Sequence, residues 1–310
     1  MRLSMSRLLA GGVVSLLSCL GQAKAERYGA RLISSLKNAR FLKAFHEVET
    51  DMGVLRFQGA DVKNIGNMLE SERRDWRKFA SHEQEVRFWI RDYLKEDQIF
   101  WDIGANVGMF TLYAALRQGV SVHAFEPYVP VLMELTQSIQ LNPFRERVRA
   151  YGIAIGPRTS MERLRLHEAI ALQGQGWRGI EGEVHKDVVK QPHSQLFASD
   201  EHTLGFFDIP AVTMDDACRV FGVPQPHHVK IDVDGLEVDL VTKGGKSVLS
   251  QLHTLMVEVE LENRGRLDGE LVPFLNSCGL VAVQTETQKD IEAQGGYAKN
   301  RLFVRASMAR

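Results

Sequence analysis

The spacing of hydrophobic positions changes near Gly104 from that of a strand to that of a helix. An apolar run typical of a buried strand covers 99–103, and apolar residues then recur at helical spacing from Met109 to Leu116. Gly104 and Gly108 lie where the two patterns meet, and a second apolar run ends at Glu126. The pattern predicts a strand, a glycine turn, a helix and a second strand, which is the repeating unit of nucleotide-binding sheets.

Similar patterns predict the other elements of the chain. We expect a short hairpin that turns at 51–53 and a helix at 213–221 that Thr213 caps. Further strands are expected at 120–125, 148–155, 228–232, 252–261, 279–285 and 302–305. Further helices are expected at 27–46, 70–95, 129–141, 236–250 and 269–275, the last capped by Asp268. Strands that alternate with helices in this way predict an α/β fold with a doubly wound sheet.

The pattern fails between Arg158 and Pro210, where several glycines and histidines interrupt every period. Long irregular segments inside a compact domain are usually functional loops or disordered. We therefore expect part of this segment to cover the active site.

The amino end supports two interpretations. Arg2 and Arg7 precede an apolar run from Leu8 to Leu20, and 23–25 resembles a signal-peptide cleavage site. Because basic residues continue beyond it, the segment also fits a helix that packs on the domain or contacts a membrane surface. We divide the chain into an N-terminal helical extension or signal-like segment, 1–45, and one domain, 46–310. We expect a cytoplasmic protein, with a cleaved signal peptide as the alternative.

Composition narrows the class of partner. The 310 residues hold 38 Lys and Arg against 39 Asp and Glu, so the formal net charge is -1 and nothing attracts the whole chain to nucleic acid. Cys19, Cys218 and Cys278 are too few and too far apart for a disulfide framework or a zinc site. We expect no nucleic-acid partner and no resident metal, although two neighbouring acids leave a weakly bound divalent ion open.

Acidic residues stand at the ends of three predicted strands. Asp102, Glu126 and Asp232 would all meet at one edge of the sheet, where doubly wound folds bind their ligands. Taken singly, Glu126 could be a surface acid and Asp232 a helix cap. Their joint position favours a nucleotide site, with Glu126 placed to bind ribose hydroxyls.

Two cofactors could use such a site. A dinucleotide site favours Gly-x-Gly-x-x-Gly, whereas the spacing here is Gly-x-x-x-Gly with Asn106 in place of the middle glycine. Asp102 directly before the turn would repel a pyrophosphate but attract the positive amino and sulfonium groups of S-adenosylmethionine. The turn therefore favours a methyl donor over NAD(P).

Four segments together resemble the FkbM family of S-adenosylmethionine-dependent methyltransferases. They are 101–108, 125–127, 212–216 and 230–235. The resemblance covers about 80–262, and 300–304 is similar to the family's closing strand. Two departures are Asp234, where a glutamate is usual, and Leu236, where the residue before the glutamate is usually small. No motif in 165–207 matches the family, so no substrate is carried over from that segment.

The resemblance implies a Rossmann-like, doubly wound class I methyltransferase sheet and S-adenosyl-L-methionine as cofactor. It also implies O-methylation of a hydroxyl group on a sugar, polysaccharide or natural product, and therefore a small-molecule or glycan acceptor. Predicted cofactor-binding residues are Asp102, Gly104, Ala105, Asn106, Gly108, Glu126, Pro127 and Ala154. Predicted catalytic residues are Asp232, as base or acceptor-orienting acid, then Lys230 and His202, with Glu258 behind them.

Each catalytic candidate also has a structural interpretation. Lys230 could pair with a strand-end acid, His202 could lie on a loop surface, and Glu258 could be structural. For His227 and His228 we favour loop or packing roles. Two other functions stay open at this point: an NAD(P)-dependent dehydrogenase or epimerase, and a non-catalytic, degenerate methyltransferase-like binding domain.

Overall fold

The computed structural model describes residues 45–58, 83–167, 203–233 and 235–309. From residue 46 onward the described residues belong to one compact unit. The signal-like segment, the predicted helix before residue 45, the first part of the predicted helices at 70–95 and His202 lie outside the described residues.

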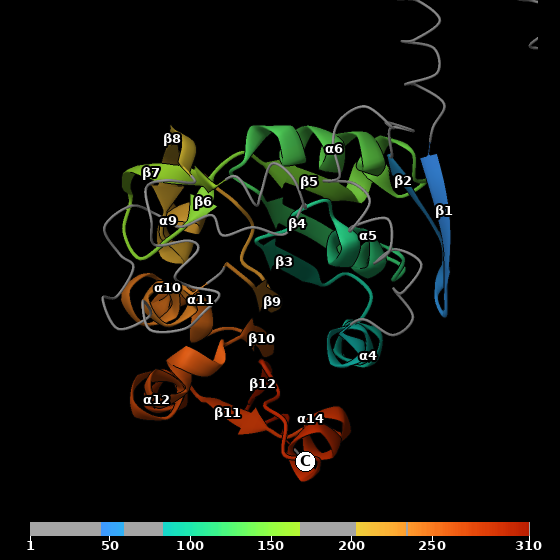
Figure 1. The fold of residues 1–310 in the computed structure, drawn as a ribbon. Helices are drawn as coiled ribbons and strands as arrows, with labels where there is room; N and C mark the ends of the chain where they lie inside the picture. The colour runs from blue at the N-terminus through green and yellow to red at the C-terminus, as the bar shows by residue number, and fades with distance from the viewer. Residues whose placement is uncertain (1–44, 59–82, 168–202, 234, 310) are drawn as a thin grey trace, which may run out of the picture. The chain divides into compact units, whose positions relative to one another are not determined.

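A seven-stranded sheet forms the centre of the described part (Figure 1), in the order β11-β12-β10-β9-β3-β4-β5. Every strand is parallel to its neighbours except β12, which runs antiparallel to both β10 and β11. The strands are β3 Ile99–Ile103, β4 Ser121–Phe125, β5 Val148–Tyr151, β9 His228–Ile231, β10 Thr254–Glu258, β11 Leu280–Val283 and β12 Asn300–Arg305. The parallel order reverses beside β3, which is the point where doubly wound sheets bind ligands.

Helices cover both faces of this sheet, as Figure 1 shows, and each face has its own hydrophobic core. One face is packed by α4 Gln84–Tyr93, α5 Met109–Ala115 and α6 Val129–Gln140. The other is packed by α9 Met214–Arg219, α10 Glu237–Gly244, α11 Lys246–Leu249 and α13 Val272–Ser277. The predicted Rossmann-like, doubly wound fold is confirmed.

Side chains along β3 alternate between two faces that are both buried, which explains its continuous apolar run. Phe100 packs into the core under α4 and α5, while Trp101 and Ile103 pack into the core on the opposite face. A parallel strand buried on both faces needs apolar residues at nearly every position. Asp102, which shares the face of Phe100, is the exception and is only 1% exposed.

The predicted hairpin is present as β1 Phe45–Thr50 and β2 Gly53–Gln58. Asp51 in its turn accepts hydrogen bonds from Arg87 on α4, at 3.0 Å, and from the hydroxyl of Tyr113 on α5, at 2.8 Å. These bonds attach the hairpin to the helical layer on one face of the sheet.

The prediction of one strand over 148–155 is wrong. The chain leaves the central sheet after Tyr151, and β6 Ala154–Ile155 pairs instead with β8 Thr203–Val212 in a separate sheet of order β6-β8-β7. The apolar run continues across this change of sheet, so hydrophobicity alone gave no sign of it.

The prediction of an irregular segment over 158–210 is also wrong at its two ends. β7 Ser160–His167 and β8 form an antiparallel ribbon there. Both strands place charged residues on their exposed face, including Arg163 opposite Asp208, so they lack a buried-strand pattern. Residues 168–202 lie outside the described part.

Three predictions near the carboxyl end need correction. The helix predicted at 269–275 begins earlier, because the helical segments η4, α12 and η5 run from Leu261 to Leu271 into α13. Asp268 therefore lies inside the helical run and is not its cap. The strand predicted to reach residue 285 ends at Val283, and α14 Glu286–Ala293 follows, capped by the side chain of Thr285.

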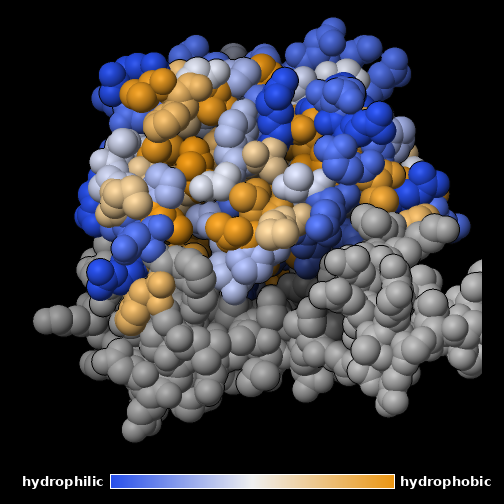
Figure 2. Space-filling view, turned by 90° about the horizontal axis from the view of Figure 1, so that it is seen from above, coloured by the Kyte–Doolittle hydropathy of each residue, from blue (hydrophilic) through white to orange (hydrophobic). Residues whose placement is uncertain are grey.

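Hydrophobic and hydrophilic residues are interspersed on the face seen from above in Figure 2. α6, at the top of Figure 1, carries exposed Val129 and Met133. Among the described residues no helix combines the length and the apolar composition that crossing a bilayer requires.

Candidate active site

The glycine turn between β3 and α5 is held against two neighbouring strands. The backbone N–H groups of Gly104 and Ala105 both donate to the carbonyl of Phe125 at the end of β4, at 3.1 and 3.0 Å. On the other side a Cβ added to Gly104 would lie 1.8 Å from the carbonyl oxygen of Asp232. Gly104 also has a φ of +78°, so only glycine fits this close approach.

Glu126 joins the turn to the second strand end. Its Oε2 accepts from the backbone N–H of Asn106 at 3.0 Å, and its Oε1 accepts from that of Tyr128 at 2.8 Å. The side chain is only 2% exposed, so these amides fix its orientation. Each carboxylate oxygen can accept a further hydrogen bond, which suits a pair of ribose hydroxyls.

Asp102 and Asn106 carry buried side-chain oxygens that lack a hydrogen-bond partner in the described part of the chain. Oδ2 of Asp102 accepts from the Thr111 hydroxyl at 2.6 Å, whereas its Oδ1 has no hydrogen-bond partner among the described residues. The side-chain oxygen of Asn106 is also buried and also has no hydrogen-bond partner among these residues. Burial raises the pKa of Asp102, and Lys230 and Thr111 only partly oppose it. Because an unmet buried acceptor costs about 1–3 kcal/mol, these atoms fit a positively charged hydrogen-bond donor.

The other predicted cofactor-binding residues lie near the turn or beyond β5. Ala105 is buried in the core under α5, and Pro127 is half-buried directly after Glu126. Ala154 lies past the end of β5, which ends at Tyr151, and it belongs to β6 of the second sheet. The described contacts therefore bring the turn and Glu126 together, and they connect Ala154 to Glu126 through Tyr128, which packs against the cluster that contains Ala154.

Lys230 and Asp232 form an ion pair at the end of β9. Lys230 is 2% exposed, and its Nζ lies 2.8 Å from Oδ2 of Asp232. Burial works against the charge of Lys230, but Asp232 and Asp102 outweigh it and raise the pKa. The structural interpretation of Lys230, pairing with a strand-end acid, is thus what the structure shows.

Glu258, at the end of β10, shares a side-chain hydrogen bond with Asp232. Burial, followed by the charge of Asp232, raises the pKa of Glu258 to about 10. Burial also acts to raise the pKa of Asp232, but Lys230 and the hydrogen bond from Glu258 lower it below its usual range. The pKa values of the two carboxyl groups are therefore shifted in opposite directions.

Glu237 holds the backbone that follows Asp232. Its Oε1 accepts from the N–H groups of Val233 and Gly235, at 3.2 and 2.9 Å. Burial raises the pKa of Glu237 to about 7, although these amides oppose the shift. The sequence marked Glu237 only through the unusual Leu236 before it, whereas the structure gives it a role in shaping the turn.

Several contacts of the site had weak signals in the sequence. Thr111, the partner of Asp102, is one polar position inside a helix, and Glu83 before α4 interacts electrostatically with Lys230 and Glu258 from a charged segment. His228 has a packing role, as expected: it is fully buried at the amino end of β9 and contacts Thr254 at 2.7 Å.

No group of three or more His, Cys, Asp or Glu residues in the described segments could hold a metal ion. Cys218 and Cys278 are free thiols.

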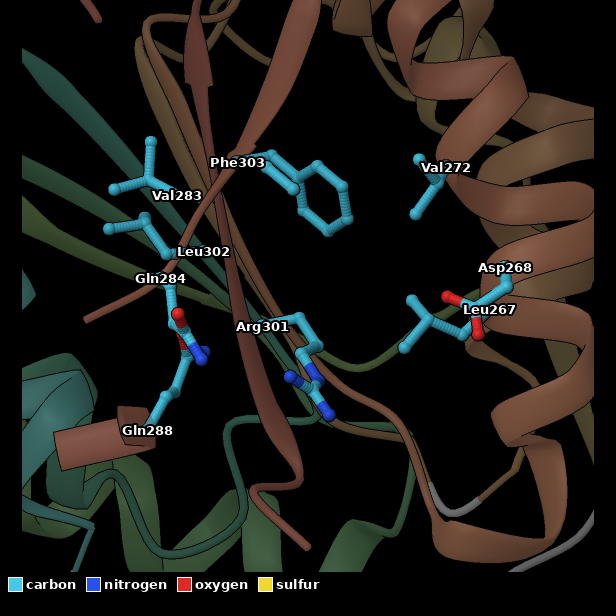
Figure 3. Close-up of a pocket in the computed structure, with 10 residues that line it drawn as sticks. Leu267, Asp268, Val272, Val283, Gln284, Gln288, Arg301, Leu302 and Phe303 are labelled. Atoms are coloured by element: carbon cyan, nitrogen blue, oxygen red, sulfur yellow. The ribbon is translucent and has the colours of Figure 1, made fainter. Parts of the chain in front are cut away.

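A separate pocket of about 180 Å³ lies at the β11–β12 edge (Figure 3). Leu267, Val272 and Phe303 supply apolar walls, and Arg301 and Asp268 add charged groups. Arg301 is already paired with Glu292 at 2.9 Å. None of the described residues predicted for the site lines this pocket, so it is distinct from the strand-end cluster.

Comparison with known protein families finds a match over the middle of the chain. The family model described as the methyltransferase FkbM domain matches residues 102–281, which is more than half of the chain. The matched range includes the glycine turn, Glu126, Asp232 and Glu258.

Two curated proteins are similar over part of their length. Hexuronic acid methyltransferase AglP from Haloferax volcanii is 25% identical over 180 residues, which cover 57% of this chain and 62% of that protein. 31-O-demethyl-FK506 methyltransferase FkbM from Streptomyces tacrolimicus is 27% identical over 206 residues, covering 61% of this chain and 75% of that protein. The chain thus spans less than two thirds of the first of these relatives.

Among solved structures, methyltransferase FkbM from Methylobacillus flagellatus KT aligns with a TM-score of 0.43 and 13% identity, covering 89% of this chain and 60% of that one.

Proposed function

The chain belongs to the FkbM methyltransferase family, and from this we propose that it transfers a methyl group from S-adenosylmethionine to a hydroxyl group of a sugar, polysaccharide or natural product. The names of the two curated relatives, one acting on a hexuronic acid and one on a demethylated FK506, support this range of acceptors. We assign the activity to the domain at 46–310, with 1–45 as an extension, and place the protein in the cytoplasm, where the donor is made.

The observation that carries the proposal is the link between the turn and Glu126. Glu126 is buried and oriented by two backbone amides, one of them from Asn106 inside the turn. In our proposal it binds the ribose hydroxyls of the donor, while the turn from Gly104 to Gly108 surrounds the methionine part. Ala105, Pro127 and Ala154 complete this side of the site. The buried oxygens of Asp102 and Asn106 suit the donor's positive charge.

When bound, the donor supplies a methyl group on a cationic sulfur. The protein then has to exclude water, orient the acceptor oxygen and accept its proton. We assign the last two tasks to Asp232, whose carboxylate is held by Lys230 at a strand end next to the glycine turn. Lys230 keeps Asp232 ionised. His202 remains a candidate from the sequence.

Transfer of a labelled methyl group tests this function. We expect the full chain to move label from S-adenosylmethionine into a hydroxyl-bearing fraction of the source organism's extract. Asp232→Asn should reduce the rate by about 10²–10⁴-fold, because it removes the proton acceptor, while donor binding persists. If the full chain binds the donor and the Asp232→Asn variant still transfers methyl groups at the wild-type rate, the role assigned to Asp232 is contradicted.

The amino terminus tests the proposed location. A mass measurement on the protein from its native cells should find residues 1–25 still present. Cleavage after Ala25 would contradict a cytoplasmic location.

A further inference from the structure

Asp232 and Glu258 leave two neighbouring parallel strands side by side. The register pairs Ile231 of β9 with Val257 of β10, and the two acids are the next residues along each strand. Neighbouring strands lie about 4.8 Å apart, so side chains at matched positions can touch. The carboxyl groups of Asp232 and Glu258 are joined by a side-chain hydrogen bond.

A hydrogen bond between two carboxyl groups requires a proton on one of them. An ionised carboxylate can only accept, so an Asp232–Glu258 bond cannot exist with both groups charged. Lys230 Nζ, at 2.8 Å from Oδ2 of Asp232, selects Asp232 as the ionised partner. Glu258 is then the acid that donates.

Lys299 approaches Glu258 but lies closer to another acid. Lys299 Nζ lies 3.7 Å from Glu258 but 2.6 Å from Oε1 of Glu260, so its closer partner is Glu260. The pKa of Glu258, raised to about 10 by burial and by Asp232, agrees with a retained proton.

We propose that Glu258 is a positioning residue of the methyl transfer, a neutral carboxylic acid whose donated hydrogen bond fixes the ionised Asp232 toward the acceptor hydroxyl. The inference rests on the proposed function and deepens it. It assigns contact with the acceptor to Asp232, and it assigns to Glu258 an effect that acts through Asp232.

This division of roles explains how Asp232, whose pKa is lowered, can still accept the proton of the acceptor hydroxyl. As the oxygen–methyl bond forms with the oxygen's lone pair, the carbon–sulfur bonding pair stays on sulfur, and the hydroxyl proton becomes strongly acidic. It passes to Asp232 and then to solvent, while Glu258 keeps its own proton. A weak base suffices for such a proton, so a fixed orientation contributes more than basicity.

Charged groups from several elements face this pair, and any dependence on pH includes them. They are Lys230 on β9, Asp102 on β3, Glu83 before α4, Glu237 on α10 and Lys299 before β12.

Two substitutions distinguish a neutral donor from an ion-pairing carboxylate. Glu258→Gln keeps a neutral group that can donate to Asp232, so we expect kcat within about threefold of wild type. Glu258→Ala removes the donor and should lower kcat by about 10–100-fold with little change in the donor's KM, as expected of lost positioning. Glu286→Gln, at an exposed acid that pairs with Lys289 outside this cluster, is the matched control and should leave kcat unchanged.

Infrared spectroscopy of the ligand-free protein gives a readout that needs no activity. The wild-type minus Glu258→Gln difference spectrum at pH 7.5 should contain the carbonyl band of a protonated carboxylic acid, and this band should disappear as the pH rises through about 10. Glu286→Gln should not remove the band.

The outcomes separate this inference from the function on which it rests. A missing band, or a Glu258→Gln variant as impaired as Glu258→Ala, would overturn the role of Glu258 even in an active methyltransferase. The infrared result holds whether or not the protein binds S-adenosylmethionine, because no donor is present in that measurement. A protein that shows the band but transfers no methyl group would instead overturn the proposed function.

Discussion

Gly104 lets the ends of β3 and β9 approach more closely than any side chain would permit. Its added Cβ would lie 1.8 Å from the carbonyl oxygen of Asp232, and its φ is +78°. We expect Gly104→Ala to lower the free energy of unfolding by about 2–6 kcal/mol, through overpacking and backbone strain together, and to weaken donor binding. Thermal unfolding and calorimetry measure the two effects.

Gly222 provides the matched control. It has a φ of +66°, but a Cβ there would meet nothing within 4 Å. Gly222→Ala should therefore cost only the conformational strain, about 1–2 kcal/mol, and leave donor binding intact. Equal losses in the two variants would show that the close approach to Asp232 is unimportant.

His228 makes the fold sensitive to acid. Burial lowers its pKa in the folded protein from 6.5 to about 3. The unfolded chain therefore binds a proton more readily than the folded one, so the stabilisation is complete above about pH 6.5 and is lost as the pH falls toward 3. At about 1.4 kcal/mol for each unit of pKa shift, the loss amounts to several kcal/mol.

Denaturant unfolding at a series of pH values checks this. His227 and His253 also have lowered pKa values, through burial, so they add to the same slope. Replacement of His228 by Gln should flatten the dependence of stability on pH between 6.5 and 3. If the dependence of stability on pH is unchanged in that variant, groups other than His228 cause the acid sensitivity.

At the scale of elements, Asp51 attaches the β1–β2 hairpin to α4 and α5. Arg87, whose side chain is 7% exposed, loses a carboxylate partner at 3.0 Å in an Asp51→Asn variant. We expect a loss of about 1–3 kcal/mol in the free energy of unfolding. Glu47→Gln, in an exposed pair with Arg56, should cost under about 1 kcal/mol, and a similar loss in both would argue against this attachment.

Helices and strands could be predicted where burial imposes a clear pattern of hydrophobic residues. β3 is buried on both faces and α5 is buried at every residue from Phe110 to Ala115, so their apolar runs gave their position within a residue or two. β7 was not predictable, because Met161 is exposed while Glu162 beside it is buried, which inverts the alternation that a half-buried strand shows. The split after Tyr151 depends on pairing with β8, a distant segment. α14 was missed because its apolar face is small and only Gln288 is buried.

At the scale of the whole molecule, parallel topology brings the predicted acids to one edge of the sheet. Asp102, Glu126 and Asp232 could be predicted to lie there, because Asp102 is near the end of an apolar strand and the other two directly follow one. The carboxyl ends of parallel strands share an edge. The bond between Asp232 and Glu258 could not, because it depends on the register of β9 against β10. Local sequence patterns locate strand ends, whereas pairing between distant strands decides which side chains touch.

Donor binding by the full chain tests the central claim most directly. Calorimetry with S-adenosylmethionine and with its demethylated product should show saturable binding at one site, and NAD(P) should show none. Glu126→Gln should weaken both by about 10–100-fold, because a charged acceptor for the ribose hydroxyls is lost. Glu146→Gln, which changes an exposed acid in the short 3-10 helix η1 Arg145–Arg147, should leave donor binding as in the wild type. Binding of NAD(P) alone, or donor binding unaffected by Glu126→Gln, would contradict a methyl-donor site at this edge of the sheet.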